Sequence, residues 1–382
     1  MPPHAPHPAP AAAQRLAAVL RLSALGDVAL TTGVLHRVFQ RTGTRFIYIT
    51  RAALAPLLAG NPAIAAVHAV DETRLRGAAW AEQAAEIASA LAERCPGLPL
   101  YDLHGTLRAR VLAARWPGPV TRYPKFSLAR RLFRLTRLGA LRRFLERLSV
   151  PQRYALAFEP EGVPAADLLP RLFLAPAEVA RGRELVRAAL PPAAPDSADA
   201  PRPVALHPYA THPDKAWPRE HWLELARLLD QRGVPWLVVG RDPEPLFPGD
   251  PRDLTGRTDL RATCAVLAAC AALATNDSGP MHLAGGVNTP VVALFGPTAR
   301  AWGFAPRGPR DVVLERDLPC RPCTLHGDHR CRHGRACLTD IPPAAVLEAL
   351  LGQTAPDHAP APGPDHAPAP GPAPDKDKEA PS

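Results

Sequence analysis

The 382-residue sequence has no apolar run close to the about 20 residues that a helix needs to cross a bilayer. Its first residues, MPPHAPHPAPAAAQ, lack both the basic start and the apolar run of a secretory signal peptide. Seven cysteines in a chain without an export signal indicate a reducing compartment, where cysteines act as thiols or metal ligands rather than in disulfides. We therefore expect a cytoplasmic protein.

Nucleic-acid-binding signatures are also missing, because no helix-turn-helix, zinc-finger, RRM or KH pattern occurs. The net charge of +9 would attract nucleic acid, phospholipid headgroups and acidic glycolipids alike. Charge alone does not choose among these partners. Since the motifs are absent, we expect no nucleic-acid partner.

The sequence does contain enough apolar residues, 47%, for the cores of two domains. Both ends lack the apolar content to fold, and the second contains PDHAPAPG twice in tandem, so we expect disordered tails. The stretch PPAAPDSADAPRP is the clearest linker. The predicted organisation is a tail (1–14), a first domain (15–190), a linker (191–203), a second domain (204–350) and a low-complexity tail (351–382).

Strand and helix patterns alternate in both predicted domains, which predicts two parallel, doubly wound α/β sheets. In such folds ligands bind at the carboxyl ends of the strands, here in the cleft between the domains. The predicted strands are 16–22, 45–50, 67–70, 101–104, 204–206, 235–239, 270–275 and 290–295, and the predicted helices are 28–41, 52–59, 80–94, 176–190, 218–230 and 260–269.

The stretch NDSGPMHLAGGVNTPVVALFGPT, residues 276–298, predicts a strand end, a polar turn, a short helix and a second strand. Proline is preorganised for the first helical position, and Asp277 or Ser278 can cap the free amides before it. Such a helix start offers N–H groups and a positive end to an anion. An ordinary capped helix without a ligand is the alternative. The density of special residues, His282 included, favours a ligand, which we interpret as a diphosphate.

Two charged residues follow predicted strands. Asp27 lies on the Gly26 turn, where a carboxylate can cap the next helix or act as a general base facing the cleft. Position alone favours the cap. Lys215, in THPDKAWP, could reach phosphate oxygens together with Thr211, although an isolated loop lysine is usually solvated.

Four motifs in this order resemble glycosyltransferase family 9, the ADP-heptose:lipopolysaccharide heptosyltransferases: RLSALGDVALTTGVLHRV, DLHGTLRAR, HPDKAWPREHW and NDSGPMHLAGGVNTPVVALFGPT. The resemblance runs from about residue 16 to residue 346. It implies a GT-B fold, in which two Rossmann-like domains face a central cleft, and inverting transfer from a nucleotide-diphospho-sugar. Gly33, and Gly285 with Gly286, depart from the family pattern without removing a reactive group.

The resemblance also implies residue roles. Asp27 stands at the position of the family's base, which takes a proton from the acceptor hydroxyl as that oxygen attacks the anomeric carbon. Lys215 stands where the leaving diphosphate is stabilised, so that no divalent metal is required. The other implied contacts are Thr211, Ser278, Gly279, Met281 and His282 for the diphosphate, Asp277 for the donor sugar, Glu244 and Thr258 for ribose and base, and His104 and Arg108 for the acceptor.

Four cysteines cluster near the end of the second domain, in segment 320–337. One CxxC pair followed by two further cysteines at short spacing is compatible with a structural tetrahedral zinc site. Structural thiols without metal are the alternative. The candidate ligands are Cys320, Cys323, Cys331 and Cys337, with His326, His329 and His333 between them.

Residues 128–148, LARRLFRLTRLGALRRFLERL, combine seven arginines and one glutamate with leucines and phenylalanines. The apolar positions roughly follow one face of a helix. One interpretation is a surface helix packed on its own domain. The other is an arginine-rich face that docks on anionic lipid or on a charged acceptor.

The leading interpretation is an inverting glycosyltransferase that moves heptose or a related sugar, with ADP-heptose as the expected donor, to a lipopolysaccharide core acceptor. It would act at the cytoplasmic face of the inner membrane with peripheral contact, where a basic chain suits an anionic glycolipid. The alternatives are a GT-B enzyme using another nucleotide sugar, and a catalytically silent nucleotide-binding protein. Asp27 together with Lys215 argues against silence, since a mere binder needs no base.

Overall fold

The computed structural model describes residues 15–191, 201–324 and 331–354. The first tail, most of the second tail and most of the linker lie outside these ranges, as do His326 and His329. Within them, no helix is both long and apolar enough to cross a membrane. The last described helix ends at Thr354, four residues beyond the predicted end of the second domain.

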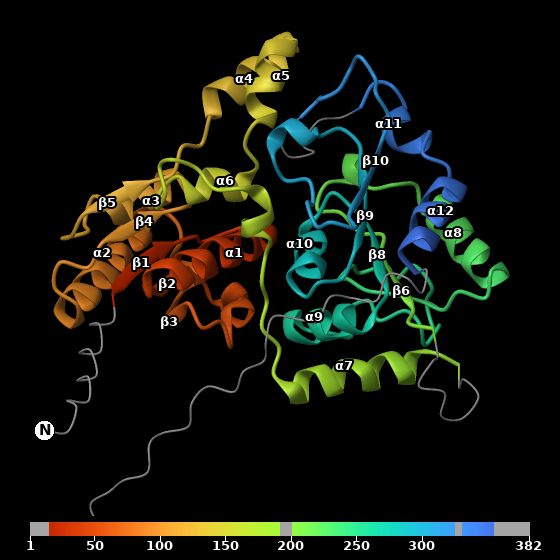
Figure 1. Cartoon of the computed structure of the whole chain (residues 1–382), viewed down its shortest axis with the longest axis horizontal. Helices are drawn as coiled ribbons and strands as arrows, with labels where there is room; N and C mark the ends of the chain where they lie inside the picture. Colours follow the sequence, from red (N-terminus) through yellow and green to blue (C-terminus); the bar gives the residue numbers. More distant parts are fainter. Residues whose placement is uncertain (1–14, 192–200, 325–330, 355–382) are drawn as a thin grey trace, which may run out of the picture.

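The first sheet is entirely parallel, in the strand order β3-β2-β1-β4-β5 (Figure 1). Alternate residues of β1 are buried on opposite faces, Val19 against α1 and Leu20 against α2, so that both faces of the sheet are covered. The elements are β1 (Leu16–Leu20), α1 (Leu25–Thr42), β2 (Arg45–Arg51), η1 (Ala52–Leu58), β3 (Ile64–Val70), η2 (Glu72–Arg74), α2 (Gly77–Arg94), β4 (Leu100–Asp102), α3 (Leu107–Ala113) and β5 (Val120–Arg122).

The second sheet is also parallel, in the order β10-β9-β8-β6-β7. Trp222 of α8 and Leu347 of α12 pack on one face, and Leu267 of α9 and Met281 of α10 belong to the core on the other. The elements are β6 (Val204–His207), η4 (Pro213–Lys215), α8 (Arg219–Gln231), β7 (Trp236–Val238), α9 (Leu260–Ala269), β8 (Ala272–Asn276), α10 (Gly279–Gly286), β9 (Val291–Phe295), η5 (Arg300–Trp302), β10 (Val312–Glu315), α11 (Ala336–Thr339) and α12 (Pro343–Thr354).

The strand order reverses once in each sheet, between β1 and β4 and between β6 and β8. In open parallel sheets these reversal points are where ligands bind, beyond the carboxyl ends of the strands. Helices α1 and α10 are in contact, so the lobes meet beside both reversal points. The fold therefore directs the segments after β1, β6 and β8 toward one space.

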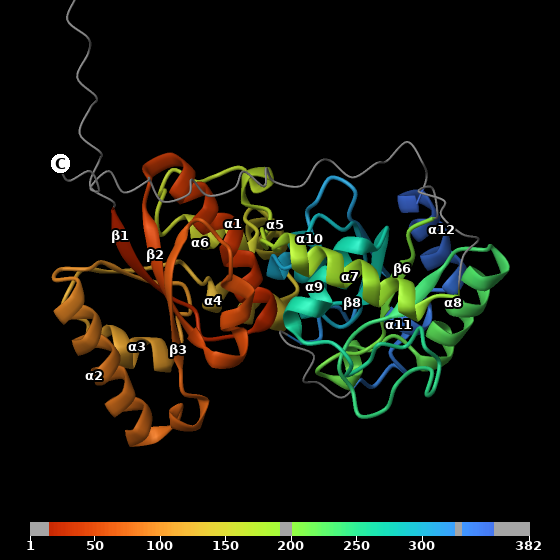
Figure 2. The same cartoon turned by 90° about the horizontal axis from the view of Figure 1, so that it is seen from below.

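The helix expected to close the first domain lies elsewhere. Helix α7 (Pro176–Ala189) packs along α9 of the second lobe, and Figure 2 shows the two side by side. A Cβ on Gly182 would lie 2.4 Å from the backbone of Ala265, so only glycine allows this approach. Helix α7 therefore packs on the second lobe although it precedes the linker, and the domain boundary at residue 190 stays a prediction.

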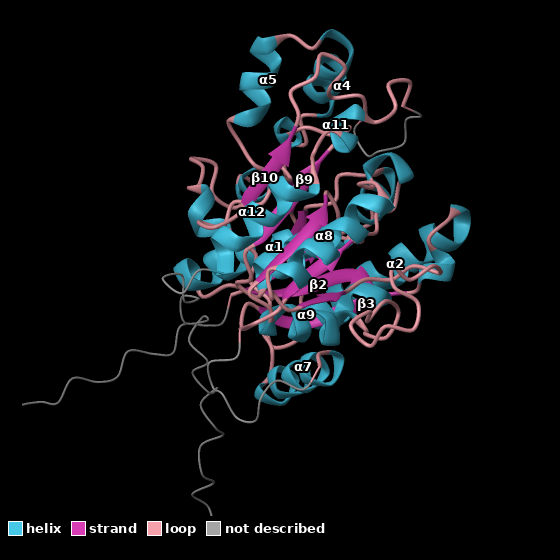
Figure 3. Ribbon diagram, turned by 90° about the vertical axis from the view of Figure 1, so that its right-hand side faces the viewer, coloured by secondary structure: helices cyan, strands magenta, loops and turns pink. Residues whose placement is uncertain are grey.

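The arginine-rich stretch forms a helical hairpin rather than one helix. Helix α4 (Ser127–Thr136) ends where Arg137 takes a left-handed conformation with φ 52°, and α5 (Gly139–Glu146) begins two residues later. Helix α6 (Val150–Ala155) then returns the chain to α1. Figures 1 and 3 show α4 and α5 together at one end of the molecule.

Candidate active site

A cavity of about 950 Å³ lies between the lobes. The first lobe contributes the turn after β1, residues 24–27, together with Ala53 and Pro56 of η1. The second lobe contributes the segments that follow β6, β7 and β8. The cavity thus lies at the strand ends where the topology predicts a ligand.

The carboxylate of Asp27 projects from the first turn of α1 and is held by three groups. Arg21 at the end of β1 forms an ion pair with Oδ2 at 2.5 Å. The hydroxyl of Tyr154, on α6, donates to Oδ1 at 2.6 Å, and the amide of Ala24 donates to Oδ2 at 3.2 Å. Asp27 therefore caps the start of α1 and also lines the cavity.

These partners keep Asp27 ionised. Burial acts to raise the pKa of Asp27, but attraction to Arg21 and the hydrogen bonds from Tyr154 and Ala24 outweigh it, and the pKa lies below its usual value. Burial acts in the opposite sense on the pKa of Arg21, yet the charge of Asp27 raises it overall. The site thus presents a carboxylate whose charge and orientation are fixed.

Further basic groups surround Asp27 on the first-lobe side. The ammonium of Lys125 lies 3.4 Å from the carbonyl oxygen of Gly105, and burial followed by repulsion from Arg21 lowers its pKa. Burial also lowers the pKa of Arg130, which lies within the electrostatic field of Asp27. This side of the site is therefore suited to an anionic molecule.

On the opposite side, Lys215 and Asp277 form a pair. Their ammonium and carboxylate groups are 2.8 Å apart, with side chains 15% and 13% exposed. The hydroxyl of Thr298 donates to the same carboxylate oxygen at 2.7 Å. Both side chains line the cavity, so an incoming anion can compete with Asp277 for Lys215.

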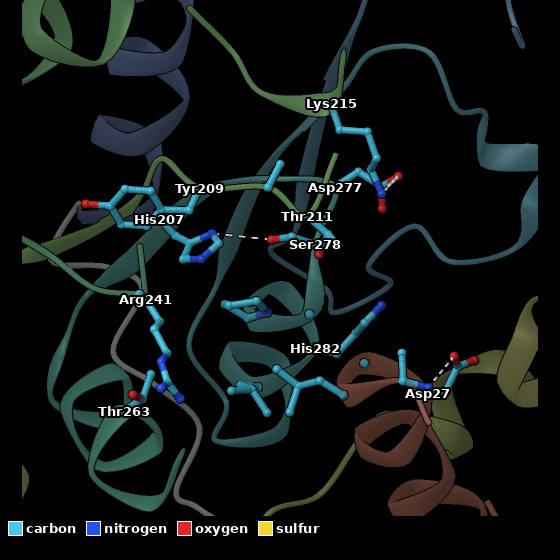
Figure 4. A pocket seen from close by; sticks show the side chains of 18 of the residues that line it. Asp27, His207, Tyr209, Thr211, Lys215, Arg241, Thr263, Asp277, Ser278 and His282 are labelled. Atoms are coloured by element: carbon cyan, nitrogen blue, oxygen red, sulfur yellow. Dashed lines mark hydrogen bonds and ion pairs between the residues drawn. The ribbon is translucent and has the colours of Figure 1, made fainter. Parts of the chain in front are cut away.

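The first turn of α10 opens into the cavity. Ser278 is the N-cap residue, but its side chain makes no capping hydrogen bond. Instead, its hydroxyl lies 3.3 Å from Nδ1 of His207, which is also 3.1 Å from the hydroxyl of Thr275 (Figure 4). The first amides of α10 therefore remain available for an anion.

His282 lies between the two halves of the site in Figure 4, with Ser278 on one side and Asp27 on the other. Its ring closely approaches the turn after β1, since a Cβ on Gly26 would lie 2.5 Å from Cδ2 of His282. Burial lowers the pKa of His282 to about 4, so the imidazole is neutral at pH 7. A neutral ring can hydrogen-bond a ligand without adding charge.

The far end of the cavity is formed by the segments after β6, β7 and before α9. Gly240 has a φ of 138°, and a Cβ there would lie 2.5 Å from the ring of Tyr209. The hydroxyls of Thr258 and Thr263 are 2.8 Å apart. The wall at this end includes Tyr209, Gly240, Arg241, Thr258 and Thr263.

Most predicted donor-side residues converge on this cavity. Thr211, Lys215, Thr258, Asp277, Ser278, Gly279 and His282 all line it, as does Asp27. Glu244 is exposed and does not line it; Arg241 and Asp242 of the same loop do. The Met281 side chain is buried and lines a separate cavity behind α10.

The two predicted acceptor residues are not at the cavity wall. His104 is buried, and burial, followed by the charges of Arg21 and Lys125, lowers its pKa to about 3. Arg108 is exposed, and its guanidinium donates to the carbonyl oxygen of Leu75 at 2.7 Å. Their acceptor role stays a prediction.

Comparison with known proteins gives the same picture as the geometry. A sequence model of glycosyltransferase family 9 (heptosyltransferase) matches residues 101–330. The chain belongs to this family. A lipooligosaccharide heptosyltransferase 2 of Haemophilus influenzae is 35% identical over 170 residues, 39% of this chain and 46% of the relative. That of Haemophilus ducreyi is 33% identical over 216 residues, 52% and 61% respectively. The chain therefore spans about half the length of the curated relatives it matches.

Solved structures of the family share the fold. The glycosyl transferase family 9 protein of Veillonella parvula matches with a TM-score of 0.70 and 21% identity, covering 89% of this chain and 97% of that chain. The ADP-heptose lps heptosyltransferase II of Escherichia coli matches with a TM-score of 0.65 and 21% identity, covering 90% and 100%. The GT-B arrangement expected from the sequence is thus confirmed.

The four clustered cysteines of this family member line a very small cavity together with Asp214. The thiol of Cys323 donates to the carbonyl oxygen of Cys320, and burial followed by the charge of Cys320 raises its pKa to about 11. Among the described residues, no three Cys, His, Asp or Glu side chains are arranged to hold a metal ion. Zinc stays a prediction that metal analysis tests: one zinc per chain would support it, and a substoichiometric amount would contradict it.

Sequence reasoning missed Arg21, Tyr154 and Arg241. Arg21 carried a signal, since it is a charged residue within an otherwise apolar strand end, six positions before Asp27. Tyr154 carried none, because it is 127 residues from the carboxylate that it contacts. Arg241 was masked by the choice of Glu244 in the same loop.

Proposed function

We propose that this protein transfers heptose from ADP-heptose to an anionic lipopolysaccharide core acceptor, with inversion at the anomeric carbon. The observation that carries the proposal is that Asp27, from one lobe, and the Lys215–α10 region, from the other, line the same cavity. Its relatives of 33–35% identity are named heptosyltransferases, and a relative of the same fold is named for ADP-heptose.

In the proposed reaction the donor diphosphate lies at the first amides of α10 and against Lys215. Asp27 takes the proton of the acceptor hydroxyl while that oxygen forms a bond to the anomeric carbon. The bond from the anomeric carbon to the diphosphate breaks, and the electron pair leaves with the nucleoside diphosphate. Lys215 and the α10 amides stabilise the charge that develops there, a role that requires no divalent cation.

The ion pair between Lys215 and Asp277 separates when the donor binds in the proposed reaction. As diphosphate approaches, Lys215 turns from Asp277 toward phosphate oxygens, and Asp277 then accepts hydrogen bonds from hydroxyls of the donor sugar. Thr298, which already donates to Asp277, keeps that carboxylate in position. In this arrangement the positive lysine faces the anionic diphosphate, and the carboxylate faces the neutral hydroxyl groups of the sugar.

The acceptor is proposed to enter on the side of Asp27. Arg21, Lys125 and Arg130 give the surroundings of Asp27 a positive charge that suits phosphates and carboxylates of a lipopolysaccharide core. Because such an acceptor is lipid-linked, we place the reaction at the cytoplasmic face of the inner membrane, with peripheral contact and no nucleic-acid partner.

Two measurements test the proposal. In a thermal-shift panel of ADP-heptose, UDP-sugars and GDP-sugars, ADP-heptose should raise the melting temperature most, because a ligand at 100 times its Kd stabilises the native state by about 2.7 kcal/mol. Asp27→Asn should lower transfer by about 100-fold or more while ADP-heptose affinity stays close to that of the wild type.

The outcomes separate the alternatives. A larger shift with a UDP- or GDP-sugar would identify a different donor. A shift without transfer to any core acceptor would indicate a silent nucleotide binder. Asp27→Asn protein that turns over normally once the donor is bound would remove Asp27 as the base.

A further inference from the structure

Exposed large apolar side chains are concentrated on the α4–α5 hairpin, residues 127–147. Among the described residues, only two others of this kind are exposed, Leu107 and Leu223. Scattered single leucines are normal on a surface, but a group on one short hairpin marks an interaction site. The hairpin's exposed members are Leu128 (79%), Leu132 (44%), Leu135 (70%), Leu138 (55%) and Phe144 (42%).

The leucines of α4 form one stripe. Leu128, Leu132 and Leu135 follow the i, i+4, i+7 spacing of a helix face, and all three are exposed. Phe133 points to the other side and is 3% exposed. Helix α4 is therefore apolar on its outer face as well as on the face that packs inward.

The inner face is fixed to both lobes. The ring of Phe133 packs on Trp302 of η5, with centroids 5.7 Å apart. Arg153 on α6 donates to the carbonyl oxygen of Leu145 at 2.8 Å, and its guanidinium lies over the ring of Phe126. Because these contacts hold the hairpin from below, the outer leucines cannot turn inward without breaking them.

The hairpin is also strongly basic. Residues 128–148 carry seven arginines and one glutamate. Of these arginines, the described part of the chain shows only Arg142 in an ion pair, with Glu146 at 2.9 Å. The exposed Arg131 and Arg134 lie on α4 to one side of the leucine stripe. An apolar stripe beside unneutralised arginines matches the two layers of an anionic bilayer surface, acyl chains and phosphates.

The position of the hairpin connects it to the acceptor side of the site. Its inner face carries Arg130, which lies in the electrostatic field of Asp27. The next helix, α6, carries Tyr154, which donates to Asp27. Figures 1 and 3 show the outer part of the hairpin at one end of the molecule, clear of both sheets. A membrane bound to the hairpin would therefore lie on the side of the molecule from which an acceptor would reach Asp27.

We propose that the α4–α5 hairpin docks on an anionic lipid bilayer, with its outer leucines at the acyl boundary and its arginines on lipid phosphates. The docked hairpin presents a membrane-borne acceptor to the Asp27 side of the cleft. The presentation step rests on the proposed function, whereas the lipid contact does not. No covalent change is involved, and the partner is the bilayer surface itself.

Flotation of the full chain with vesicles tests the lipid contact without donor or acceptor. The wild type should float with phosphatidylcholine vesicles containing phosphatidylglycerol and remain in solution with pure phosphatidylcholine. The variant Leu128→Ser, Leu135→Ser, Leu138→Ser should reduce the vesicle-bound fraction by about tenfold or more, since it removes the apolar anchor. These side chains are exposed, so the fold and melting temperature should not change. The matched control is Leu107→Ser with Leu223→Ser, which should float as the wild type does.

A second pair of variants tests the charge. Arg131→Gln with Arg134→Gln should lower the vesicle-bound fraction, because fewer lipid phosphates are contacted. Added salt should also reduce the binding of this variant less than it reduces that of the wild type. Arg183→Gln with Arg187→Gln removes two exposed arginines from α7 and should leave flotation unchanged.

Activity on a deacylated, water-soluble core acceptor separates this inference from the proposed function. If the hairpin docks on lipid, the leucine variant should keep its activity on that acceptor and lose it on acceptor embedded in vesicles. Equal flotation of the leucine variant and the wild type would overturn the inference and leave the proposed function untouched. The inference would also be overturned if the wild type formed dimers that depend on these leucines and did not bind vesicles, because a second copy of the chain would then cover the hairpin. An arginine variant that loses activity on the soluble acceptor while floating normally would also overturn it, since the arginines would then bind the acceptor itself.

Discussion

Asp27 depends on groups that the chain brings from two other elements. Arg21 directly follows β1 and Tyr154 belongs to α6, yet both contact the same carboxylate. Burial alone would raise the pKa of Asp27, and these contacts lower it, so the carboxylate keeps its charge inside the cleft. A base needs that charge, although a lower pKa weakens its proton affinity. In the proposed reaction, the fixed orientation of the carboxylate would compensate for the weaker base.

Tyr154→Phe removes one of these contacts and should shift the pH profile of transfer. Asp27 must be ionised to act, so activity falls as the pH drops through its pKa. Loss of the hydroxyl raises that pKa, and the acidic limb of the kcat/KM profile should move up by about one pH unit. Tyr101→Phe, which changes a half-buried tyrosine stacked on Phe158, should leave the limb in place. An unchanged limb in Tyr154→Phe would show that Asp27 does not set it.

The hydrogen bond from Tyr154 to Asp27 should also make the stability of the fold depend on pH. Because the folded-state pKa of Asp27 lies below its usual value, its ionisation stabilises the fold above the unfolded pKa, about 3.9. That stabilisation is lost as the pH falls through the folded-state pKa. Tyr154→Phe narrows the difference between the folded-state and unfolded-state pKa of Asp27. The unfolding free energy of this variant should therefore differ from that of the wild type more at pH 7 than at pH 2.

Lys215→Gln and Lys125→Gln should separate the donor and acceptor sides. Lys215 is paired with Asp277 on the proposed diphosphate side, and its loss would leave a carboxylate facing the ligand, so ADP affinity should fall by about tenfold or more. Lys125 lies on the first-lobe side, so its loss should raise the acceptor KM and leave ADP affinity unchanged. Calorimetric titration with ADP and steady-state kinetics measure the two effects. Equal ADP affinities in Lys215→Gln and the wild type would exclude Lys215 from the donor site.

At this scale, local sequence predicted residues whose neighbours in the chain are also neighbours in the site. Ser278, Gly279 and His282 fall within one turn and all reach the cavity. Tyr154 could not be found in this way, because its contact with Asp27 exists only after α6 packs on α1. Glu244 was chosen by spacing within a loop, where no periodic pattern fixes which side chain faces inward.

At the scale of elements, long periodic segments were predicted well and their packing was not. The helix predicted at 260–269 has those bounds in α9, and the apolar runs of both sheets became strands. The 128–148 stretch has a helical pattern throughout, yet Arg137 in a left-handed conformation ends α4. Helix α7 was predicted as a helix, but its packing on α9 was not, because α9 begins more than seventy residues later in the chain.

Gly182→Ala tests the packing of α7 on α9. The new Cβ would lie 2.4 Å from the Ala265 backbone, so the helices must separate, and the unfolding free energy should fall by about 1–3 kcal/mol. Gly352→Ala in α12 is the matched control, since no atom lies within 4 Å of its Cβ position. That change should stabilise the protein by up to about 1 kcal/mol through helix propensity. Denaturant titration measures both, and a Gly182→Ala protein as stable as the control would contradict the close approach.

At the scale of the molecule, the two sheets share more than a cleft. One hydrophobic core runs from Val19 in the first lobe to Leu273 in the second. Arg261 on α9 pairs with Glu178 of α7, and the amide of Val150 donates to the carbonyl oxygen of Gly303 across the lobes at 2.9 Å. The geometry between Asp27 and Lys215 therefore depends on contacts remote from both residues. Sequence could predict two lobes and a cleft but not the contacts that join them, because the partners Arg153 and Trp302 are 149 residues apart in the chain.

Arg153 is the polar centre of that joint. It lies on α6 and is 2% exposed, and it donates to the carbonyl oxygen of Leu145 in its own lobe and to that of Trp302 in the other at 3.2 Å. Burial, followed by repulsion from Arg130, lowers the pKa of Arg153 to about 10, yet it remains charged at pH 7. Its removal would leave buried carbonyl groups unpaired on both sides of the joint.

Arg153→Met should therefore lower the melting temperature and split the calorimetric transition into two, because the lobes would unfold with less coupling. ADP should raise only the transition of the second lobe, where the donor side of the cavity is formed. Arg202→Met is the matched control: Arg202 also donates to backbone carbonyl groups, those of Ala268, Ala269 and Cys270, but all within one lobe. It should lower the melting temperature without splitting the transition. A single transition in Arg153→Met that shifts as much with ADP as the wild type does would show that the two lobes are coupled without this arginine.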